Sequence, residues 1–280
     1  MNDSADMRAV ADWLVRAHGA SLQFAPFAAA HGVETLADAY QVQAEYMKRV
    51  RAARGAGVAG YKIGLTSAAM QKMCGIDSPV AGVMLDDIVH SSGAQLNPAN
   101  YGHLGIEFEV AVRLGRALDQ AGHTYTLEDV QGAVDAVAPA VEVVDDRNCD
   151  YKSLDILSLV ADNAWNAGVV LGEFRSSWPD LAEVEGRMLV DGHDSGARGV
   201  GRDVLGHPFN SVAWLATHLC AQGANLRAGD IVMTGSMITT RFPSAGQDYR
   251  FELAGLGSVS VRVSGSQEKP CAADSFSSAP

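Results

Sequence analysis

The stretch HLGIEFEVAVRLG, residues 103–115, decides which face of the predicted fold carries chemistry. Apolar residues recur at every second position along it, and several of them are β-branched or aromatic, which is typical of a β-strand. Successive side chains of a strand point to opposite faces. The alternation therefore places Glu107, Glu109 and Ala111 on one face and the apolar residues on the other.

Two carboxylates at positions i and i+2 of a strand converge on one volume, and they repel each other unless a cation lies between them. A third acid, Glu142, lies inside the apolar segment AVEVV at 140–144, where a charge needs a partner. Glu107, Glu109 and Glu142 provide only carboxylate oxygens as ligands. Such a ligand set favours Mg²⁺ or Mn²⁺ over zinc. The same spacing also fits two solvent-facing glutamates and an ion-paired third.

Three further features are candidates for catalysis or binding. Lys62 lies between two glycines in GYKIG, 60–64, where it could bind a substrate carboxylate or act as an acid or base; a surface lysine is the alternative. Asp86 and Asp87 could shuttle a proton or form a turn. Arg147 follows two aspartates, so it could bind an anion or form a structural ion pair with them.

The flanking segments predict an α+β fold. Helical periodicity over 5–19 and 34–54 predicts a helical N-terminal region, 1–57. Many strands and three helices follow over 58–264. One of these helices is predicted for TLEDVQGAVDAV from its N-cap Thr126, and a hairpin is predicted to turn at Asp191-Gly192. The polar tail 265–280 is predicted to be disordered.

Composition narrows the class of function. The chain has 280 residues and a formal net charge of -12, which argues against general binding to nucleic acids or to anionic membranes. Its four cysteines are scattered, so no disulfide or zinc scaffold is expected. The N-terminus lacks the pattern of a signal peptide, and we expect a cytoplasmic protein. A small anionic substrate is compatible with the negative net charge, because one bound metal ion can make the electrostatic potential inside a pocket positive.

Eight segments occur in order between residues 5 and 263. They are GYKIGLTS (60–67), GIDSPVAG (75–82), LDD (85–87), IEFE (106–109), APAVEVVDDR (138–147), VADN (160–163), GHPFNSVAWL (206–215) and AGDIVMTGS (228–236). As an ordered set they resemble the 2-keto-4-pentenoate hydratase / 4-oxalocrotonate decarboxylase branch of the fumarylacetoacetate hydrolase family. Two departures stand out: Phe108 replaces a common proline, and Trp165 and Asn166 replace small residues.

The resemblance implies a mixed β-sheet roll with a small helical N-terminal region, usually in a homo-oligomer. It implies Mg²⁺ or Mn²⁺ on the three glutamates. It also implies positions for the remaining candidates: Lys62, Asp86 and Asp87 beside the substrate, Thr234 or Ser236 near its carboxylate, and Arg147 and Asn163 among the substrate-binding residues.

The activity implied is that of a hydratase in the catabolism of aromatic compounds. It would convert a 2-hydroxy-2,4-dienoate into a 4-hydroxy-2-oxo acid. The alternatives are a decarboxylase acting on a 2-oxo-3-enedioate and a non-catalytic partner of a sister pathway enzyme.

Overall fold

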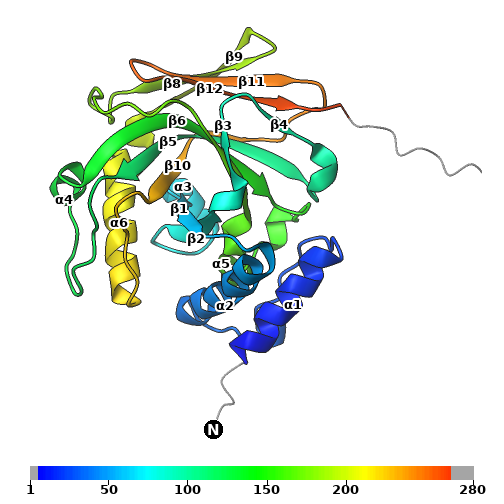
Figure 1. The fold of residues 1–280 in the computed structure, drawn as a ribbon. Helices are drawn as coiled ribbons and strands as arrows, with labels where there is room; N and C mark the ends of the chain where they lie inside the picture. The colour runs from blue at the N-terminus through cyan, green and yellow to red at the C-terminus, as the bar shows by residue number, and fades with distance from the viewer. Residues whose placement is uncertain (1–5, 266–280) are drawn as a thin grey trace, which may run out of the picture.

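A curved seven-stranded sheet forms the centre of the molecule (Figure 1) in the computed structural model, which describes residues 6–265. Its strand order is β2-β1-β10-β5-β6-β7-β3. The strands are β1 (Val58–Gly64), β2 (Val80–Leu85), β3 (Val89–Ser91), β5 (Leu104–Leu114), β6 (Val134–Asp145), β7 (Asn166–Leu171) and β10 (Ile231–Arg241). β1 pairs in parallel with β10, and β3 with β7, while the other neighbours are antiparallel.

A second, five-stranded sheet lies over one face of the first (Figure 1) and has the order β4-β12-β11-β8-β9. Its strands are β4 (Ala94–Leu96), β8 (Glu185–Val190), β9 (His193–Val200), β11 (Asp248–Leu253) and β12 (Gly257–Val263). Phe108 of β5 meets Phe251 of β11 between the sheets, with ring centroids 5.3 Å apart. Helix α6 (Pro208–Ala221) adds its apolar side to the same core. The apolar face of β5 is therefore buried, as its alternation predicts.

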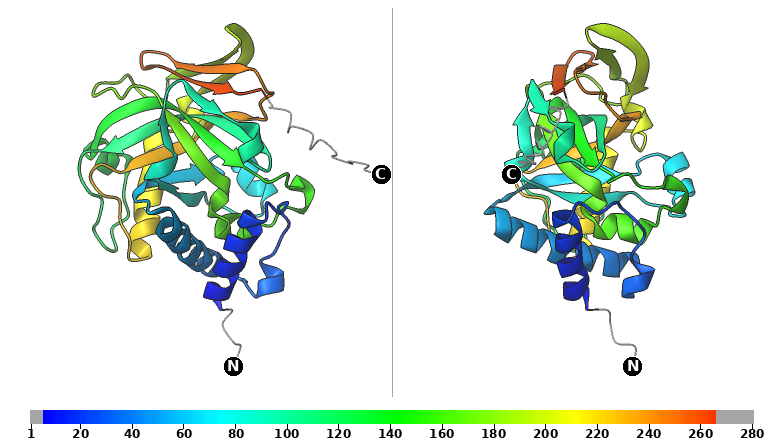
Figure 2. Two further views of the ribbon diagram at one scale, coloured as in Figure 1. Left: turned by 45° about the vertical axis from the view of Figure 1, so that its right-hand side comes forward. Right: turned by 90° about the vertical axis from the view of Figure 1, so that its right-hand side faces the viewer.

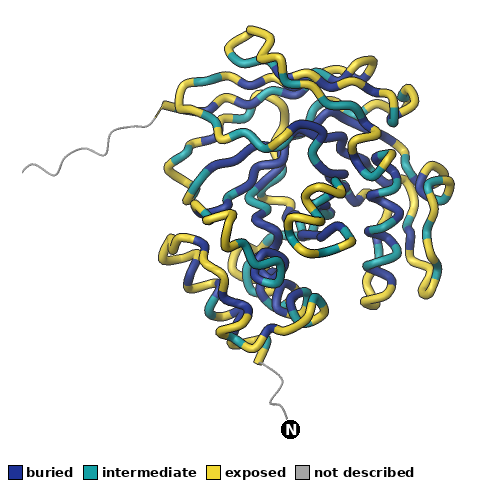
Figure 3. The backbone as a smooth tube through the Cα atoms, turned by 180° about the vertical axis from the view of Figure 1, so that it is seen from behind, coloured by how far each residue is buried: buried dark blue, intermediate teal, exposed yellow. Residues whose placement is uncertain are grey.

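Two N-terminal helices, α1 (Met7–Gly19) and α2 (Leu36–Arg54), lie at the end of the molecule away from the second sheet (Figure 2). α2 begins at Thr35, whose hydroxyl caps the Asp38 N–H while the Asp38 carboxylate caps the Thr35 N–H. Figure 3 shows the helices buried on their inner sides and exposed on their outer sides. Their inner residues pack with α5 (Ile156–Ala161) and with Val144 of β6. Since Val144 lies two residues from Glu142 on one strand, this helical cluster borders the glutamate face.

Most sequence predictions hold for the described residues. The α+β class and the mixed-sheet roll are confirmed, and the hairpin turns at Asp191 and Gly192, which both have positive φ. The predicted tail, 265–280, lies outside the described residues except for Gly265. Within residues 6–265, none of the helices has the length and apolarity needed to cross a bilayer.

One predicted helix is wrong in extent. The helix that starts at the Thr126 cap is α4 (Leu127–Gln131), and β6 already begins at Val134. A short helix α3 (Ala68–Met73) lies between β1 and β2. Val134 pairs with Leu114 of β5. Backbone hydrogen bonding and packing against β5 therefore outweigh the helical propensity of this segment.

Candidate metal centre

Three glutamates meet on the face of the first sheet that points away from the second sheet. The register of β5 and β6 sets Glu107 directly opposite Glu142, and Glu109 follows two residues later. One carboxylate oxygen from each of the three lies within 4.8 Å of the others. The predicted convergence of these acids is therefore present, and it depends on pairing between strands that the sequence alone does not display.

The carboxylates are held in surroundings that oppose their charge. Glu109 and Glu142 are fully buried at 0% exposure. Burial, together with the charges of Glu142 and Glu107, raises the pKa of Glu109 well above its ordinary value. Burial also raises the pKa of Glu142, although the Lys62 ammonium acts in the opposite direction. Ionised carboxylates this close require a cation.

Four donors from three strands, β1, β7 and β10, fix the orientation of these side chains. The Gly235 N–H donates to Glu109 Oε2 at 2.8 Å, and the Thr240 hydroxyl donates to Glu107 Oε1. Glu142 Oε1 accepts from Asn166 Nδ2 at 3.0 Å and contacts Lys62 Nζ at 3.2 Å.

After these bonds, Glu109 Oε1 and Glu142 Oε2 are buried and have no partner among the described residues. Two buried acceptor oxygens that nothing satisfies, within a set of three carboxylates, fit a hard divalent cation.

Lys62 is the buried cation of this face, with 4% of its surface exposed. Its strand β1 pairs with β10 beside Met233 and with β2 beside Gly82. Burial lowers the pKa of Lys62, but the charges of Glu142, Glu107 and Glu109 outweigh burial and leave that pKa above the ordinary value. The three carboxylates therefore favour the ammonium form of Lys62, which is suited to act as an acid or an anion binder.

Asp86 and Asp87 lie at the other end of the β1–β2 pair from Lys62, and the expectation that they lie beside the substrate stays a prediction. Both are exposed, in a 3₁₀ turn after β2. Asp86 Oδ1 accepts from the Gly57 N–H at 2.9 Å, and Asp87 lies 3.6 Å from Arg54. Gly57 is five residues from Lys62 along the chain, roughly 16 Å at the rise of a strand. Asp86 therefore bonds the backbone at the end of the β1–β2 pair that is farther from Lys62, and Asp87 lies next to it.

The two β10 hydroxyls are occupied by backbone groups. Thr234 is fully buried and donates to the Val110 carbonyl at 2.9 Å. Ser236 donates to the Ile238 carbonyl at 2.6 Å and accepts from the Phe108 N–H at 3.3 Å. Between them, Gly235 has the positive φ of 116°, a conformation that favours glycine and turns its N–H toward Glu109. In this geometry the segment TGS positions Glu109, a candidate metal ligand, and contact of Thr234 or Ser236 with a substrate stays a prediction.

The two remaining candidates for substrate binding also make structural contacts. Arg147 Nη2 pairs with the buried carboxylate of Asp162, not with the carboxylates of its neighbours in sequence. The Asn163 amide accepts from the Val83 N–H at 2.7 Å and donates to the Val83 carbonyl at 2.9 Å. The geometry thus assigns both residues a role in holding the fold, with the substrate contact left as a prediction.

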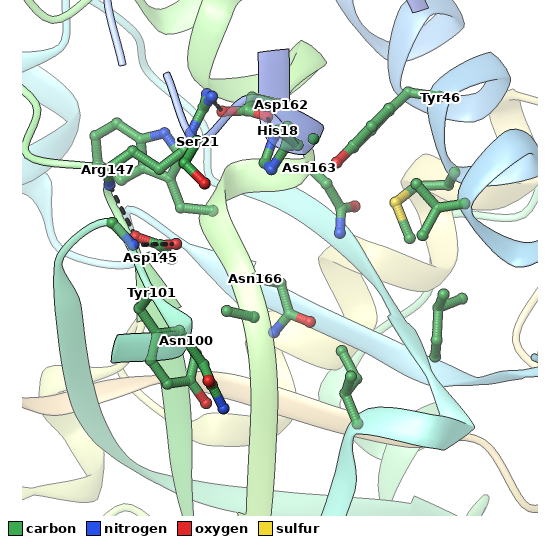
Figure 4. A pocket seen from close by; sticks show the side chains of 18 of the residues that line it. His18, Ser21, Tyr46, Asn100, Tyr101, Asp145, Arg147, Asp162, Asn163 and Asn166 are labelled. Carbon is green, nitrogen blue, oxygen red and sulfur yellow. Dashed lines mark hydrogen bonds and ion pairs between the residues drawn. The ribbon is translucent and has the colours of Figure 1, made fainter. Parts of the chain in front are cut away.

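A cavity of about 580 Å³ lies between the N-terminal helices and β7, and neither the three glutamates nor Lys62 are part of its wall. Its wall includes Arg147, Asn163, Trp165 and Asn166. Figure 4 shows Asn163 and Asn166 on one stretch of backbone that borders this cavity, with Tyr101 on a neighbouring segment. Asn166 lines the cavity and also donates a hydrogen bond to Glu142. This residue therefore connects the cavity wall to the candidate metal centre.

Three groups of this site were missed by sequence reasoning: the Gly235 N–H, Thr240 and Asn166. The register between β10 and β5 shifts three times between Met233 and Arg241, so counting along the strand does not reveal that Thr240 reaches Glu107. One feature of the sequence pointed to Asn166: the family that the chain resembles commonly has small residues at this position.

Comparisons with known proteins agree with this geometry. Residues 67–264 match the family model for the fumarylacetoacetate (FAA) hydrolase C-terminal region. The chain belongs to the fumarylacetoacetate hydrolase family. The resemblance inferred from the ordered segments is confirmed, down to the hydratase and decarboxylase branch.

Two curated members of the fumarylacetoacetate hydrolase family illustrate the branch. A 2-oxo-hept-4-ene-1,7-dioate hydratase from Escherichia coli is 36% identical over 235 residues, which are 81% of this chain and 86% of the relative. A 2-hydroxyhexa-2,4-dienoate hydratase from Comamonas testosteroni is 35% identical over 242 residues, 85% of this chain and 90% of the relative.

A solved structure from the same branch has the same fold. It is the 4-oxalocrotonate decarboxylase from Pseudomonas putida G7, complexed with magnesium and adipate. Its TM-score is 0.85 at 33% identity, over 92% of this chain and 97% of that chain.

Proposed function

We propose that this chain is a divalent-metal-dependent lyase that adds water to a 2-hydroxy-2,4-dienoate and releases a 4-hydroxy-2-oxo acid. The observation that carries the proposal is the set of Glu107, Glu109 and Glu142 next to the buried ammonium of Lys62. Glu109 and Glu142 are buried, and each has one oxygen without a partner among residues 6–265. Its similarity to hydratases of 2-hydroxy-dienoates and 2-oxo-enoates supports the same reaction class.

Glu107, Glu109 and Glu142 would hold Mg²⁺ or Mn²⁺, both of which prefer oxygen ligands. When bound, the ion supplies positive charge that stabilises the negative charge developing on the oxygens of a 2-oxo acid. The magnesium in the decarboxylase structure described above is consistent with this choice.

Lys62 supplies the proton that the first step requires. In the dienoate, the 2-hydroxyl loses a proton and C5 gains one, which yields the 2-oxo-3-enoate. The Lys62 ammonium carries protons on Nζ, which lies 3.2 Å from the neighbouring Glu142 oxygen. Water then adds across the C3–C4 double bond, with its oxygen at C4 and a proton at C3.

A decarboxylase is the second candidate, and the similarity to the solved 4-oxalocrotonate decarboxylase favours it. It would release CO₂ from a 2-oxo-3-enedioate at the same centre, and it needs a cation for the second carboxylate. Arg147 is an obvious group for that purpose, but its guanidinium is committed to Asp162. We therefore favour the hydratase.

Turnover of each substrate with Mn²⁺ decides between the two. We expect the diene absorbance of a 2-hydroxy-2,4-dienoate to decay with formation of the 4-hydroxy-2-oxo acid. Release of CO₂ from the enedioate without any hydration product would overturn the hydratase assignment.

A variant ties the activity to this site. Lys62→Met is expected to lower kcat about 10²- to 10⁴-fold, the usual worth of a positioned acid or base. Its Mn²⁺ affinity should not fall, because Asn166 still holds Glu142 and the change removes a positive charge that repels the ion. The control is Lys72→Met, which changes an exposed lysine of α3.

A non-catalytic partner of a sister enzyme would retain the fold without needing the ion. Glu107→Ala tests this: Mn²⁺ affinity equal to that of the wild type would favour the non-catalytic role. The expectations of a cytoplasmic homo-oligomer and of association with a sister enzyme stay predictions.

A further inference from the structure

The side chain of Asn166, the first residue of β7, bonds a metal ligand with one end only. Asn166 Nδ2 donates to Glu142 Oε1 at 3.0 Å, and Lys62 Nζ lies 3.2 Å from the same oxygen. A carboxylate oxygen accepts hydrogen bonds, so this contact identifies the nitrogen end of the amide. Two donors on Oε1 hold the carboxylate so that Oε2, which has no partner among residues 6–265, is left for a cation.

The other end of the Asn166 amide makes no hydrogen bond to any of the residues 6–265. Its Oδ1 is buried and has no hydrogen-bond partner within the described part of the chain. An amide oxygen is only an acceptor, and a buried acceptor left unsatisfied costs free energy. An O–H or N–H donor completes it, as would a cation, whereas a substrate carboxylate or a metal-bonded carboxylate cannot fill this role.

The backbone before Asn166 is held in an unfavourable conformation that delivers this side chain. Asn163, Ala164 and Trp165 have φ of 55°, 47° and 58°, three successive left-handed residues. Left-handed backbone is normally adopted by single residues, mostly glycine or asparagine. The Asn163 amide fastens the turn to Val83, and the Trp165 ring packs edge-on against Phe24. Strain that the surroundings maintain in this way is typical of functional sites.

We propose that Asn166 is a catalytic residue with two tasks. Its NH₂ group holds Glu142 in position for the metal, and its carbonyl oxygen accepts a hydrogen bond from the water that attacks C4. The inference rests on the proposed hydratase function. The water oxygen bonds to C4, C3 gains one proton and the water loses one, while the amide orients the water and takes up no proton.

The first measurement is Mn²⁺ binding by titration calorimetry without substrate. Asn166→Ala is expected to weaken Mn²⁺ affinity 10- to 100-fold, the usual effect of removing a group that orients a metal ligand. Asn100→Ala, which truncates an exposed asparagine bordering the same cavity, should bind as the wild type does. Wild-type affinity in Asn166→Ala would overturn the role at Glu142.

The second measurement separates the two chemical steps at saturating Mn²⁺. Asn166→Ala should hydrate the 2-oxo-3-enoate about 100-fold more slowly, as expected for a misplaced reactant, while conversion of the dienoate to that enoate slows less than tenfold. The oxo-enoate then accumulates. Equal slowing of both steps would overturn the role of Oδ1, because general damage to the site slows both.

Two further results keep the test decisive. Asn166→Ser, which keeps a short hydroxyl, should lie between the wild type and Asn166→Ala in both measurements, and it replaces the alanine variant if that protein fails to fold. If the wild type itself forms no hydration product from any dienoate, the proposed function fails, and the role of Oδ1 fails with it. The Mn²⁺ titration would still decide whether Asn166 positions Glu142.

Discussion

Charge placed in apolar surroundings determines the behaviour of Glu107, Glu109 and Glu142. If all three are ionised, they carry -3, and the neighbouring Lys62 reduces this to -2. A divalent cation cancels the remainder, whereas a monovalent ion leaves a buried charge. The site is therefore matched in charge as well as in ligand type to Mg²⁺ or Mn²⁺, and its stability without metal should depend on protons.

The raised pKa of Glu109 predicts how the metal-free protein responds to pH. A carboxyl whose pKa is higher in the folded state binds its proton more tightly there than in the unfolded chain. Its contribution to the free energy of unfolding is therefore fully present below about pH 4.5, the ordinary pKa. That contribution is lost as pH rises from there through the raised pKa of Glu109. Urea unfolding in EDTA between about pH 5 and pH 8 should show this decline. Mn²⁺ should abolish it by replacing the proton.

Glu109→Gln is the variant that checks the cause of this pH dependence. The neutral amide removes the buried like charge, so the metal-free variant should be more stable than the wild type near neutral pH by roughly 1 kcal/mol or more. It should also bind Mn²⁺ more weakly. Glu34→Gln, at an exposed position before α2, should change neither property. A metal-free wild type with constant stability over this range would contradict the argument.

At the scale of elements, the left-handed turn of Asn163–Trp165 joins β7 to the edge strand β2. The Asn163 amide bonds both the N–H and the carbonyl of Val83, as a neighbouring strand would. The approach is close, because a Cβ at Gly82 would lie 2.7 Å from the Asn163 carbonyl oxygen. The turn thus completes the hydrogen bonding of β2 while it aims Asn166 at Glu142.

Two variants of Asn163 separate its side chain from its backbone. Asn163→Ala removes both bonds to Val83 and places alanine in left-handed backbone, so we expect a loss of about 2–4 kcal/mol in the free energy of unfolding. Asn163→Gly removes the same bonds but accepts the backbone conformation, so its loss should be about 1 kcal/mol smaller. Chemical denaturation measures both, and equal losses would contradict the claim that the turn is strained.

Local pattern predicted most elements, and long-range pairing explains where it failed. The alternation of β5 was sufficient to place Glu107 and Glu109 on one face. The segment after Gly132 satisfies a helical and an extended pattern equally well, and its pairing with β5 makes it a strand. Asp86 and Asp87 carried no local sign of their distance from Lys62, because that distance follows from the antiparallel register of β1 and β2.

At the scale of the whole molecule, the N-terminal helices and the sheet share one core. The Ser158 hydroxyl of α5 accepts from the N–H groups of Phe27 and Ala28. Gln43 of α2 donates to the carbonyls of Ala81 and Val160 at 2.9 and 2.7 Å. These contacts join the helical region to both β2 and α5. We infer that the described part of the predicted helical region, residues 6–57, folds together with the sheet instead of forming an independent unit.

Asp162 contacts both the helical region and the sheet region, so its substitution tests whether the two unfold together. Its buried carboxylate accepts from His18 of α1 at 2.6 Å and pairs with Arg147, which follows β6. Asp162→Asn leaves the Arg147 charge buried without a counter-ion, so the free energy of unfolding should fall by about 3–5 kcal/mol. His18→Ala, at a side chain that is 37% exposed, should cost about 1 kcal/mol. If the helices and sheet form one cooperative unit, both variants unfold in a single transition by circular dichroism and by tryptophan fluorescence. An early transition confined to the helical signal of Asp162→Asn would instead show that the helices unfold alone.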